Sequence, residues 1–262
     1  MVEAERRVYA DRSVHLGDPD FHKVPQDELL NKEYSVFRMR NFSFDKATPS
    51  SEIKAGSFVP AESYETTHYN VVDRDGNSVS VTTTLNGAFG SFVVVEDAGF
   101  LLNNEMDDFS VKPGAPNLYG LTGGKANAIQ PGKRMLSSMT PTIVEKDGKL
   151  FMVIGTPGGS TIITSVFQTI LNVTEFGQDI TEAVASPRFH HQWLPDEVFV
   201  EKDAISAEVR EELTKKGYKF VGKSPWGWTD GTWGRVDAII VNEDGSYTGG
   251  ADPRGDDYIS GY

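Results

Sequence analysis

Two adjacent threonines, Thr66 and Thr67, follow Glu65 and precede a strand-like run that ends at Thr84. A threonine hydroxyl is a weak nucleophile unless a base lies beside it, and the simplest base is its own α-amino group once the preceding peptide bond is cut. One residue then supplies both base and nucleophile. The bond that would have to break here is Glu65-Thr66. Because threonine pairs are also common at the start of strands, the pair alone leaves a purely structural role open.

A glycine-containing turn, Thr156-Pro157-Gly158-Gly159-Ser160, separates a predicted strand (150–155) from a predicted helix (160–176) that we expect Ser160 to cap. The first N–H groups of a helix lack intrahelical partners, so they can stabilise the negative oxygen of a tetrahedral intermediate. Because they lack side chains, Gly158 and Gly159 would permit a ligand to approach the backbone closely. A structural turn is an equal alternative, whereas a phosphate loop is disfavoured because no Lys-Ser/Thr pair follows.

Two polar clusters could bind the charged groups of a ligand. Glu105, Asp107 and Asp108 follow an apolar run and suit an ammonium group, although a solvated acidic turn or a calcium loop is an alternative; the EF-hand spacing is absent. Ser137 and Ser138 offer hydroxyl donors to a carboxylate, although serine pairs are also common in loops. An α-amino acid carries both groups and would use both clusters.

The pattern of apolar residues and turns predicts an α+β fold with helices layered on sheets. We expect a helix over 1–12, a short helix over 25–34, and a loop or exposed tail over 41–65. A hairpin is predicted from strands 69–72 and 78–84. The other predicted strands are 91–95, 142–145, 150–155, 218–221, 235–241 and 247–251, and the other predicted helices are 160–176, 181–185 and 206–216.

Composition excludes several functional classes. The 262 residues are 38% hydrophobic, which suits a packed core, and the net charge of −13 without a basic cluster argues against a nucleic-acid partner. The absence of cysteine excludes disulfides, thiolate metal sites and a cysteine nucleophile. Adjacent His190 and His191 would point in different directions, so a structural corner is favoured over a metal pair. The charged N-terminus and the lack of a long apolar run indicate neither an export signal nor a membrane span.

Taken together, these motifs resemble the γ-glutamyltranspeptidase family, from Tyr9-Ala10-Asp11-Arg12 to Asp252-Pro253-Arg254. The resemblance implies the αββα sandwich of the N-terminal nucleophile hydrolases and a precursor that cuts itself at Glu65-Thr66. Residues 1–65 would be the C-terminal remnant of the large subunit, and residues 66–262 the small-subunit catalytic region. We expect the sandwich to be incomplete, because the upstream portion of the large subunit is absent from this chain.

The resemblance also implies a role for each candidate residue. Thr66 is similar to the family's nucleophile, Thr84 to the hydroxyl that assists it, and Gly158 and Gly159 to the oxyanion-hole pair. The remaining matches bind the substrate: Asn86, Glu105 and Asp108 hold the glutamyl α-amino group, Ser137 and Ser138 hold its α-carboxylate, and Tyr119 is a lid residue that can bond to Asn86. No residue here matches the family's arginine that clamps the α-carboxylate.

The implied reaction forms a threonyl ester from glutathione or another γ-glutamyl compound and transfers the glutamyl group to water, an amino acid or a dipeptide. No cofactor or metal is expected. The expected partners are the missing large-subunit portion or a second copy of the chain, and the family resemblance implies a periplasmic or secreted location. Two alternatives stay open: a related acylase or poly-γ-glutamate transpeptidase, and a catalytically silent fragment that needs a partner chain.

Overall fold

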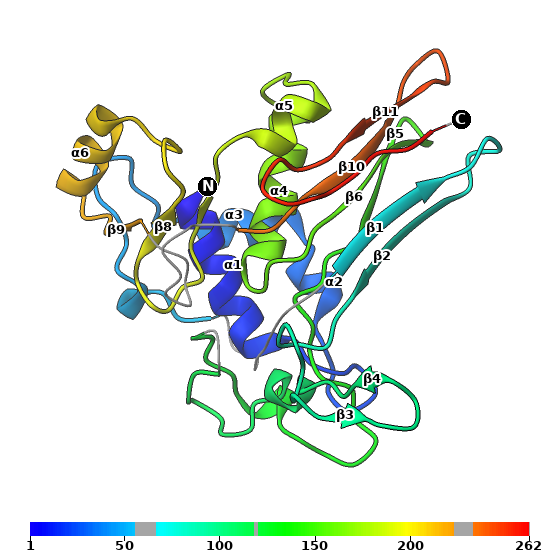
Figure 1. The fold of residues 1–262 in the computed structure, drawn as a ribbon. Coiled ribbons are helices and arrows are strands. Elements are labelled where there is room, and N and C mark those ends of the chain that lie inside the picture. The colour runs from blue at the N-terminus through cyan, green and yellow to red at the C-terminus, as the bar shows by residue number, and fades with distance from the viewer. Residues whose placement is uncertain (56–66, 118–119, 223–232, 262) are drawn as a thin grey trace. The chain divides into compact units, whose positions relative to one another are not determined.

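The computed structural model describes residues 1–55, 67–117, 120–222 and 233–261. The chain forms two compact units, each assembled from segments that are distant in sequence (Figure 1). The first comprises Met1–Ser63, Asn104–Ser137 and Phe189–Gly231, and the second comprises Tyr64–Asn103, Ser138–Arg188 and Thr232–Tyr262. No helix within the described ranges is long and apolar enough to cross a membrane.

The first unit combines helices with a small three-stranded sheet. Its helical elements are α1 (Val2–His15), α2 (Gln26–Leu29), α3 (Lys32–Met39), α6 (Ala207–Lys215) and the 3-10 turns η1 (Ser50–Glu52), η2 (Glu105–Asp108) and η3 (Lys125–Asn127). Its strands β7 (Phe189–His190), β8 (Val198–Val200) and β9 (Phe220–Val221) lie in the order β7-β8-β9. The β7-β8 pair is antiparallel and the β8-β9 pair is parallel.

Helix α1 is buried although it is rich in charge. Arg6 and Arg7 both pair with Glu3, and Arg6 also pairs with Asp196, so the buried charges compensate one another. The segment that follows α3 is also packed, since Ala47, Ser50 and Ile53 are buried. Over the described part of 41–65, the expected loop is confirmed apart from the short turn η1 (Ser50–Glu52), whereas the alternative of an exposed tail is wrong.

The second unit contains ten elements: β1 (Thr67–Val72), β2 (Ser78–Thr83), β3 (Val94–Val95), β4 (Phe100–Leu101), β5 (Thr142–Lys146), β6 (Lys149–Gly155), α4 (Thr161–Thr174), α5 (Ile180–Ala185), β10 (Asp237–Val241) and β11 (Tyr247–Gly250). The four-stranded sheet has the order β11-β10-β6-β5, with every neighbouring pair antiparallel. Strands β1 and β2 form a separate hairpin, drawn in cyan in Figure 1, and β3 and β4 form a second, shorter one.

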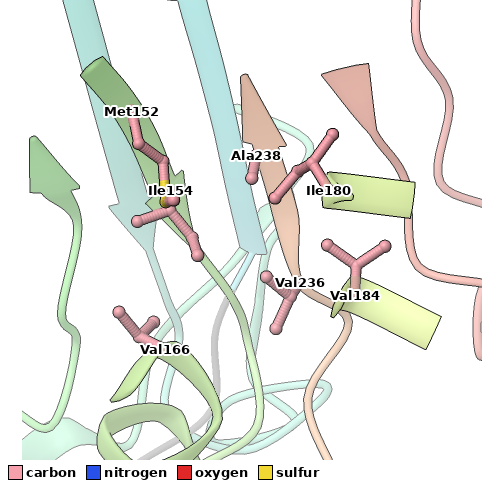
Figure 2. Packing of buried hydrophobic residues seen from close by; sticks show 7 residues of the cluster. All are labelled: Met152, Ile154, Val166, Ile180, Val184, Val236 and Ala238. Carbon is pink, nitrogen blue, oxygen red and sulfur yellow. The ribbon is translucent and has the colours of Figure 1, made fainter. Parts of the chain in front are cut away.

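The core of the second unit lies between the four-stranded sheet and two helices. Met152 and Ile154 alternate along β6 so that both face α4 and α5, as the two-residue period of a strand requires. Figure 2 shows the seven side chains that meet there: Met152, Ile154, Val166, Ile180, Val184, Val236 and Ala238. Burying each of the larger aliphatic side chains stabilises the fold by about 1.5–3 kcal/mol.

The hairpin β1-β2 contacts the four-stranded sheet through polar groups. Asn70 Nδ2 donates to the carbonyl of Asp237 over 2.8 Å, and Ser80 Oγ donates to the carbonyl of Ile154 over 3.2 Å. The strand register pairs Tyr69 with Val81 on the opposite face. The hairpin therefore presents its polar face to the sheet, and these hydrogen bonds fix its position on the sheet.

The structure confirms the predicted α+β class and most predicted elements, although several bounds differ. The predicted strand 218–221, for example, is reduced to β9. The predicted helix over 25–34 is two helices, because the Asn31 side chain accepts from the N–H groups of Glu33 and Tyr34 and starts a new helix. The predicted strand 91–95 is reduced to β3, since Phe92 has a left-handed φ of 59° that interrupts an extended chain. Helix α4 ends at Thr174 rather than at residue 176.

Candidate active site

Three of the predicted site residues, Glu65, Thr66 and Tyr119, lie outside the described residues. Thr67 is the first described residue after this gap. It begins β1 and pairs with Thr83 of β2. Thr84 follows Thr83 directly. The hairpin register thus brings the start of β1 and the predicted assisting hydroxyl to the same end of the hairpin.

A tight turn after β2 connects Thr84 to Asn86. The N–H of Asn86 donates to Thr84 Oγ1 over 2.8 Å, and Asn86 adopts a left-handed φ of 68°, which asparagine tolerates better than most residues. Asn86 is fully buried. The Thr84 hydroxyl accepts this bond and keeps its own proton to donate.

The predicted glycine turn lies between β6, which ends at Gly155, and α4, which begins at Thr161. Gly158 and Gly159 have positive φ angles of 129° and 59°, which side-chain-bearing residues rarely adopt. The expected side-chain cap by Ser160 is wrong. Ser160 already has helical backbone angles, and the N–H groups of Thr161 and Ile162 donate to the carbonyls of the two glycines, each over 3.1 Å.

His68 connects the start of the hairpin to this turn, and sequence reasoning missed it. Its ring lies so close to Gly155 that a Cβ added to Gly155 would overlap it, and its Nδ1 is 2.8 Å from Thr82 Oγ1. Burial lowers the pKa of His68, so the ring is neutral at pH 7. The residue that follows Thr67 therefore packs against the root of the glycine turn.

The predicted ligand-binding residues of the first unit are connected by Asn127, a second residue that sequence reasoning missed. Asn127 is fully buried, and its side chain donates to the carbonyl of Asp108 over 2.6 Å. Its Oδ1 accepts from the N–H of Leu136 over 3.0 Å, one residue before Ser137. One amide thus ties the acidic turn η2 to the serine segment, and the only sequence signal for it is an asparagine in a polar loop.

Two of the three acidic residues of η2, Glu105 and Asp108, differ in environment. Asp108 is 4% exposed and Glu105 is half-buried. Burial raises the pKa of Glu105 above its ordinary value. Ser137 belongs to the first unit, where its carbonyl accepts from Arg12 Nη2 over 3.1 Å, whereas Ser138 belongs to the second unit and is fully buried.

The histidine pair lies in a buried hydrogen-bonded corner. His190 Nε2 is 2.9 Å from Gln192 Oε1, and His191 Nδ1 accepts from the N–H of Trp193 over 3.1 Å. Burial lowers the pKa of both histidines, that of His190 to about 3. Within the described part of the chain, no group of three or more His, Cys, Asp or Glu side chains is placed to hold a metal ion.

The fold is α+β, and its glycine turn adjoins a hairpin that begins one residue after a threonine. These features place the chain in the class of N-terminal nucleophile hydrolases, to which the matched solved structures belong. More narrowly, the chain belongs to the γ-glutamyltranspeptidase family, whose model matches residues 1–262.

Curated relatives support the same assignment. The glutathione hydrolase proenzyme of Escherichia coli (strain K12) is 53% identical over 263 residues, which cover 100% of this chain and 44% of the relative. The glutathione hydrolase proenzyme of Bacillus subtilis (strain 168) is 38% identical, covering 96% of this chain and 42% of the relative. The chain therefore spans less than half the length of these relatives.

The solved structures that match differ in their sequence identity to the chain and in how much of it they cover. A mutant of Helicobacter pylori γ-glutamyltranspeptidase is 55% identical with a TM-score of 0.67, covering 72% of this chain and 100% of the matched chain. Cephalosporin acylase from Bacillus halodurans is 25% identical with a TM-score of 0.82, covering 100% of this chain and 44% of that one.

Proposed function

We propose that this chain is the catalytic region of a γ-glutamyl hydrolase and transferase that cleaves the γ-glutamyl amide of glutathione and related compounds. The observation that carries the proposal is the packing of His68 against Gly155, because it holds the strand that follows Thr66 at the root of the Gly158-Gly159 turn. A nucleophile at the start of β1 needs an oxyanion site nearby, and this contact supports the assignment of Gly158 and Gly159 to that role.

The proposed reaction begins with cleavage of Glu65-Thr66, which frees the Thr66 amine. That amine takes the hydroxyl proton while Oγ1 attacks the γ-carbonyl carbon of the donor, and the resulting oxyanion is stabilised by the N–H groups of Gly158 and Gly159. The intermediate collapses with proton transfer to the leaving amine and leaves an ester on Thr66. Water or an acceptor amine then attacks the ester. Thr84 assists by hydrogen bonding to the nucleophilic oxygen.

Recognition of the glutamyl head group is assigned to charge pairing. Glu105 and Asp108 would bind the α-ammonium group together with the Asn86 amide, and Ser137 and Ser138 would donate to the α-carboxylate. The Asn127 bridge supports this assignment for the first unit, since it links the acidic turn to the serine segment. Tyr119 is proposed as the lid residue.

Two observations support self-cleavage into pieces that stay bound. Residues 66–262 make up 75% of the chain, and matched chains in solved γ-glutamyltranspeptidases cover 72–75% of it while being covered almost completely themselves. The first unit also joins segments from both sides of residue 65. Arg6 pairs with Asp196, and Asp196 Oδ2 accepts from the N–H of Ser50 over 2.9 Å. Such partly buried bonds would help to hold the first piece in place after cleavage.

The partner proposed for the chain is the part of its longer relatives that the chain does not cover, or a second copy of the chain. Tyr69, Val71 and Val79 lie on the outer face of the hairpin and are each about half exposed, at 51%, 52% and 51%. An apolar face of this kind favours a covering partner. Family membership also supports an exported protein, in the periplasm or outside the cell.

A γ-glutamyl 4-nitroanilide tests the proposal directly, since hydrolysis releases the coloured amine 4-nitroaniline. Thr66→Ala should abolish release, whereas Thr67→Ala, the matched neighbour, should retain most of it. Equal release by wild type and Thr66→Ala would refute the assignment of the nucleophile. No release by the wild-type chain would support the silent-fragment alternative.

A second candidate, an acylase, is favoured by the match to the Bacillus halodurans cephalosporin acylase. A glutaryl anilide separates the two functions, because it lacks the α-amino group that Glu105 and Asp108 are proposed to bind. A γ-glutamyl enzyme should discriminate against it by about 10²-fold or more, since the glutaryl group cannot form the charge-assisted hydrogen bonds proposed for the α-ammonium group. Equal rates on the two anilides would favour the acylase.

A further inference from the structure

The glycine turn lies directly against the backbone of residues 233–236, here called the backing segment. A Cβ added to Gly158 would lie 2.6 Å from the nitrogen and 2.7 Å from the Cα of Gly234. Gly158 is therefore required by the close approach of two backbones. A Cβ added to Gly234 would in turn lie 2.6 Å from Thr156 Oγ1 and 3.0 Å from the carbonyl oxygen of Pro157, so the backing segment lies directly behind the turn.

The backing segment is itself anchored at both ends. The carbonyl of Trp233 accepts from Arg188 Nη1 over 3.0 Å, and the N–H of Val236 donates to Asp252 Oδ2 over 2.8 Å. All of these groups are buried. The backing segment is thus held in place by charged side chains inside the second unit.

The hydroxyl of Thr156 links the backing segment to the glycine turn by hydrogen bonds. Thr156 is fully buried, its Oγ1 accepts from the N–H of Arg235 over 2.7 Å, and it donates to the carbonyl of Pro157 over 2.6 Å. The carbonyl of Pro157 and the N–H of Gly158 belong to one planar trans peptide and point in opposite directions. By holding that carbonyl, the Thr156 hydroxyl orients the Gly158 N–H away from the backing segment.

Thr161 acts in the same way on the next peptide. Its Oγ1 donates to the carbonyl of Gly158 over 2.6 Å, and its own N–H donates to the same oxygen over 3.1 Å. This carbonyl shares a peptide plane with the N–H of Gly159. Peptides flanked by glycine rotate with little steric cost, so their orientation has to be imposed by bonds of this kind.

We propose that Thr156 and Thr161 are positioning residues that preset the two N–H groups of the oxyanion hole, each by holding the carbonyl of the peptide to which that N–H belongs. The inference rests on the proposed function for the role of Gly158 and Gly159, but the orientation of the two peptides can be measured without any activity. Because the carbonyl of Gly158 also accepts from the N–H of Thr161, removal of the Thr161 hydroxyl should have the smaller effect.

Valine and serine variants separate the hydroxyl from the shape of the side chain. With a γ-glutamyl anilide, Thr156→Val should lower kcat by about 10- to 100-fold and Thr161→Val by about 3- to 10-fold, with KM changed less than about 3-fold. Thr156→Ser and Thr161→Ser should restore kcat to within about 3-fold. Thr164→Val is the matched control, because Thr164 is a buried threonine of α4 whose hydroxyl donates to the carbonyl of Thr161.

Nuclear magnetic resonance gives the readout that does not depend on catalysis. Selective labelling of Pro-Gly and Gly-Gly peptides reduces the spectrum to three Pro-Gly amides, one of them Gly158, and three Gly-Gly amides, one of them Gly159. Wild type, both serine variants and Thr164→Val should show one sharp signal for each amide, whereas Thr156→Val should broaden or double that of Gly158. If the valine variants keep single signals at the wild-type positions, the inference is overturned. If wild type shows the expected signals but releases no amine, the proposed function fails while the inference stands.

Discussion

Replacing Asp252 with asparagine should strongly destabilise the second unit. The Asp252 carboxylate is fully buried and accepts from Arg188 Nη2 over 2.6 Å, from Arg254 Nη1 over 2.9 Å and from the N–H of Val236 over 2.8 Å. Burial alone would raise the pKa of Asp252, yet the two guanidinium groups hold it below its ordinary value. The variant would leave the Arg188 charge, whose side chain is 2% exposed, without its anionic partner.

The expected loss follows from that uncompensated charge. Removing one partner of a buried ion pair costs about 3–5 kcal/mol. With a urea dependence of about 2 kcal/mol per molar, the unfolding midpoint should fall by about 1.5–2.5 M. Hydrogen exchange of peptides from β6 and β10, measured by mass spectrometry at increasing urea, would report the unfolding of this unit.

The control for this prediction is Asp256→Asn. Asp256 is fully exposed, and Arg235 Nη1 pairs with it at 3.3 Å, so its loss should leave the midpoint unchanged within error. A midpoint for Asp252→Asn that equals that of Asp256→Asn would refute the reasoning. It would mean that the arginines are stabilised without the buried carboxylate.

Three further predictions concern pH and cleavage. Burial, followed by the nearby charges of Asp257 and Asp252, raises the pKa of Asp237 to about 7 from an ordinary 3.8. The folded chain therefore keeps a proton that the unfolded chain loses, so stability should fall as pH rises through this window. After discounting for partial exposure, Asp237→Asn should gain about 1–2 kcal/mol of unfolding free energy at pH 8 and flatten the pH profile of thermal unfolding. Asp196→Asn should weaken the hold on residues 1–65 and release them from the self-cleaved protein during gel filtration, because Arg6 loses the carboxylate partner that lies on the other piece. Co-elution as in wild type would argue against this interface. Since burial raises the pKa of Glu105, donor affinity should increase as pH rises through that pKa, and Glu105→Gln should remove the dependence from the pH profile of KM.

Sequence patterns predicted the parts of the fold that are governed by local chemistry. The hairpin β1-β2 follows from alternating valines and from a turn in which Asp73 accepts from the N–H groups of Asp75 and Asn77. Helix α4 follows from its apolar spacing and from the glycines before it. The strand-turn-helix context of Gly158 and Gly159 was predicted for the same reason.

Features that depend on distant partners could not be predicted. Helix α1 has no apolar stripe and therefore looks solvent-exposed in sequence, yet Arg6 is buried because Asp196 lies beside it in the fold. The packing of Ser50 depends on the same carboxylate. Asn127 and His68 are single polar residues whose roles arise only when η2 and β6 are placed next to them.

Intact-mass spectrometry of the purified chain tests the central claim most directly, that Thr66 becomes the nucleophile only after Glu65 is released. The chain would be mixed with a γ-glutamyl anilide and quenched in acid. We expect two pieces that meet at Glu65-Thr66, with one added glutamyl group on the larger piece, attached at Thr66. A single uncleaved chain that nevertheless releases the amine, or a glutamyl group attached to another residue, would contradict the account.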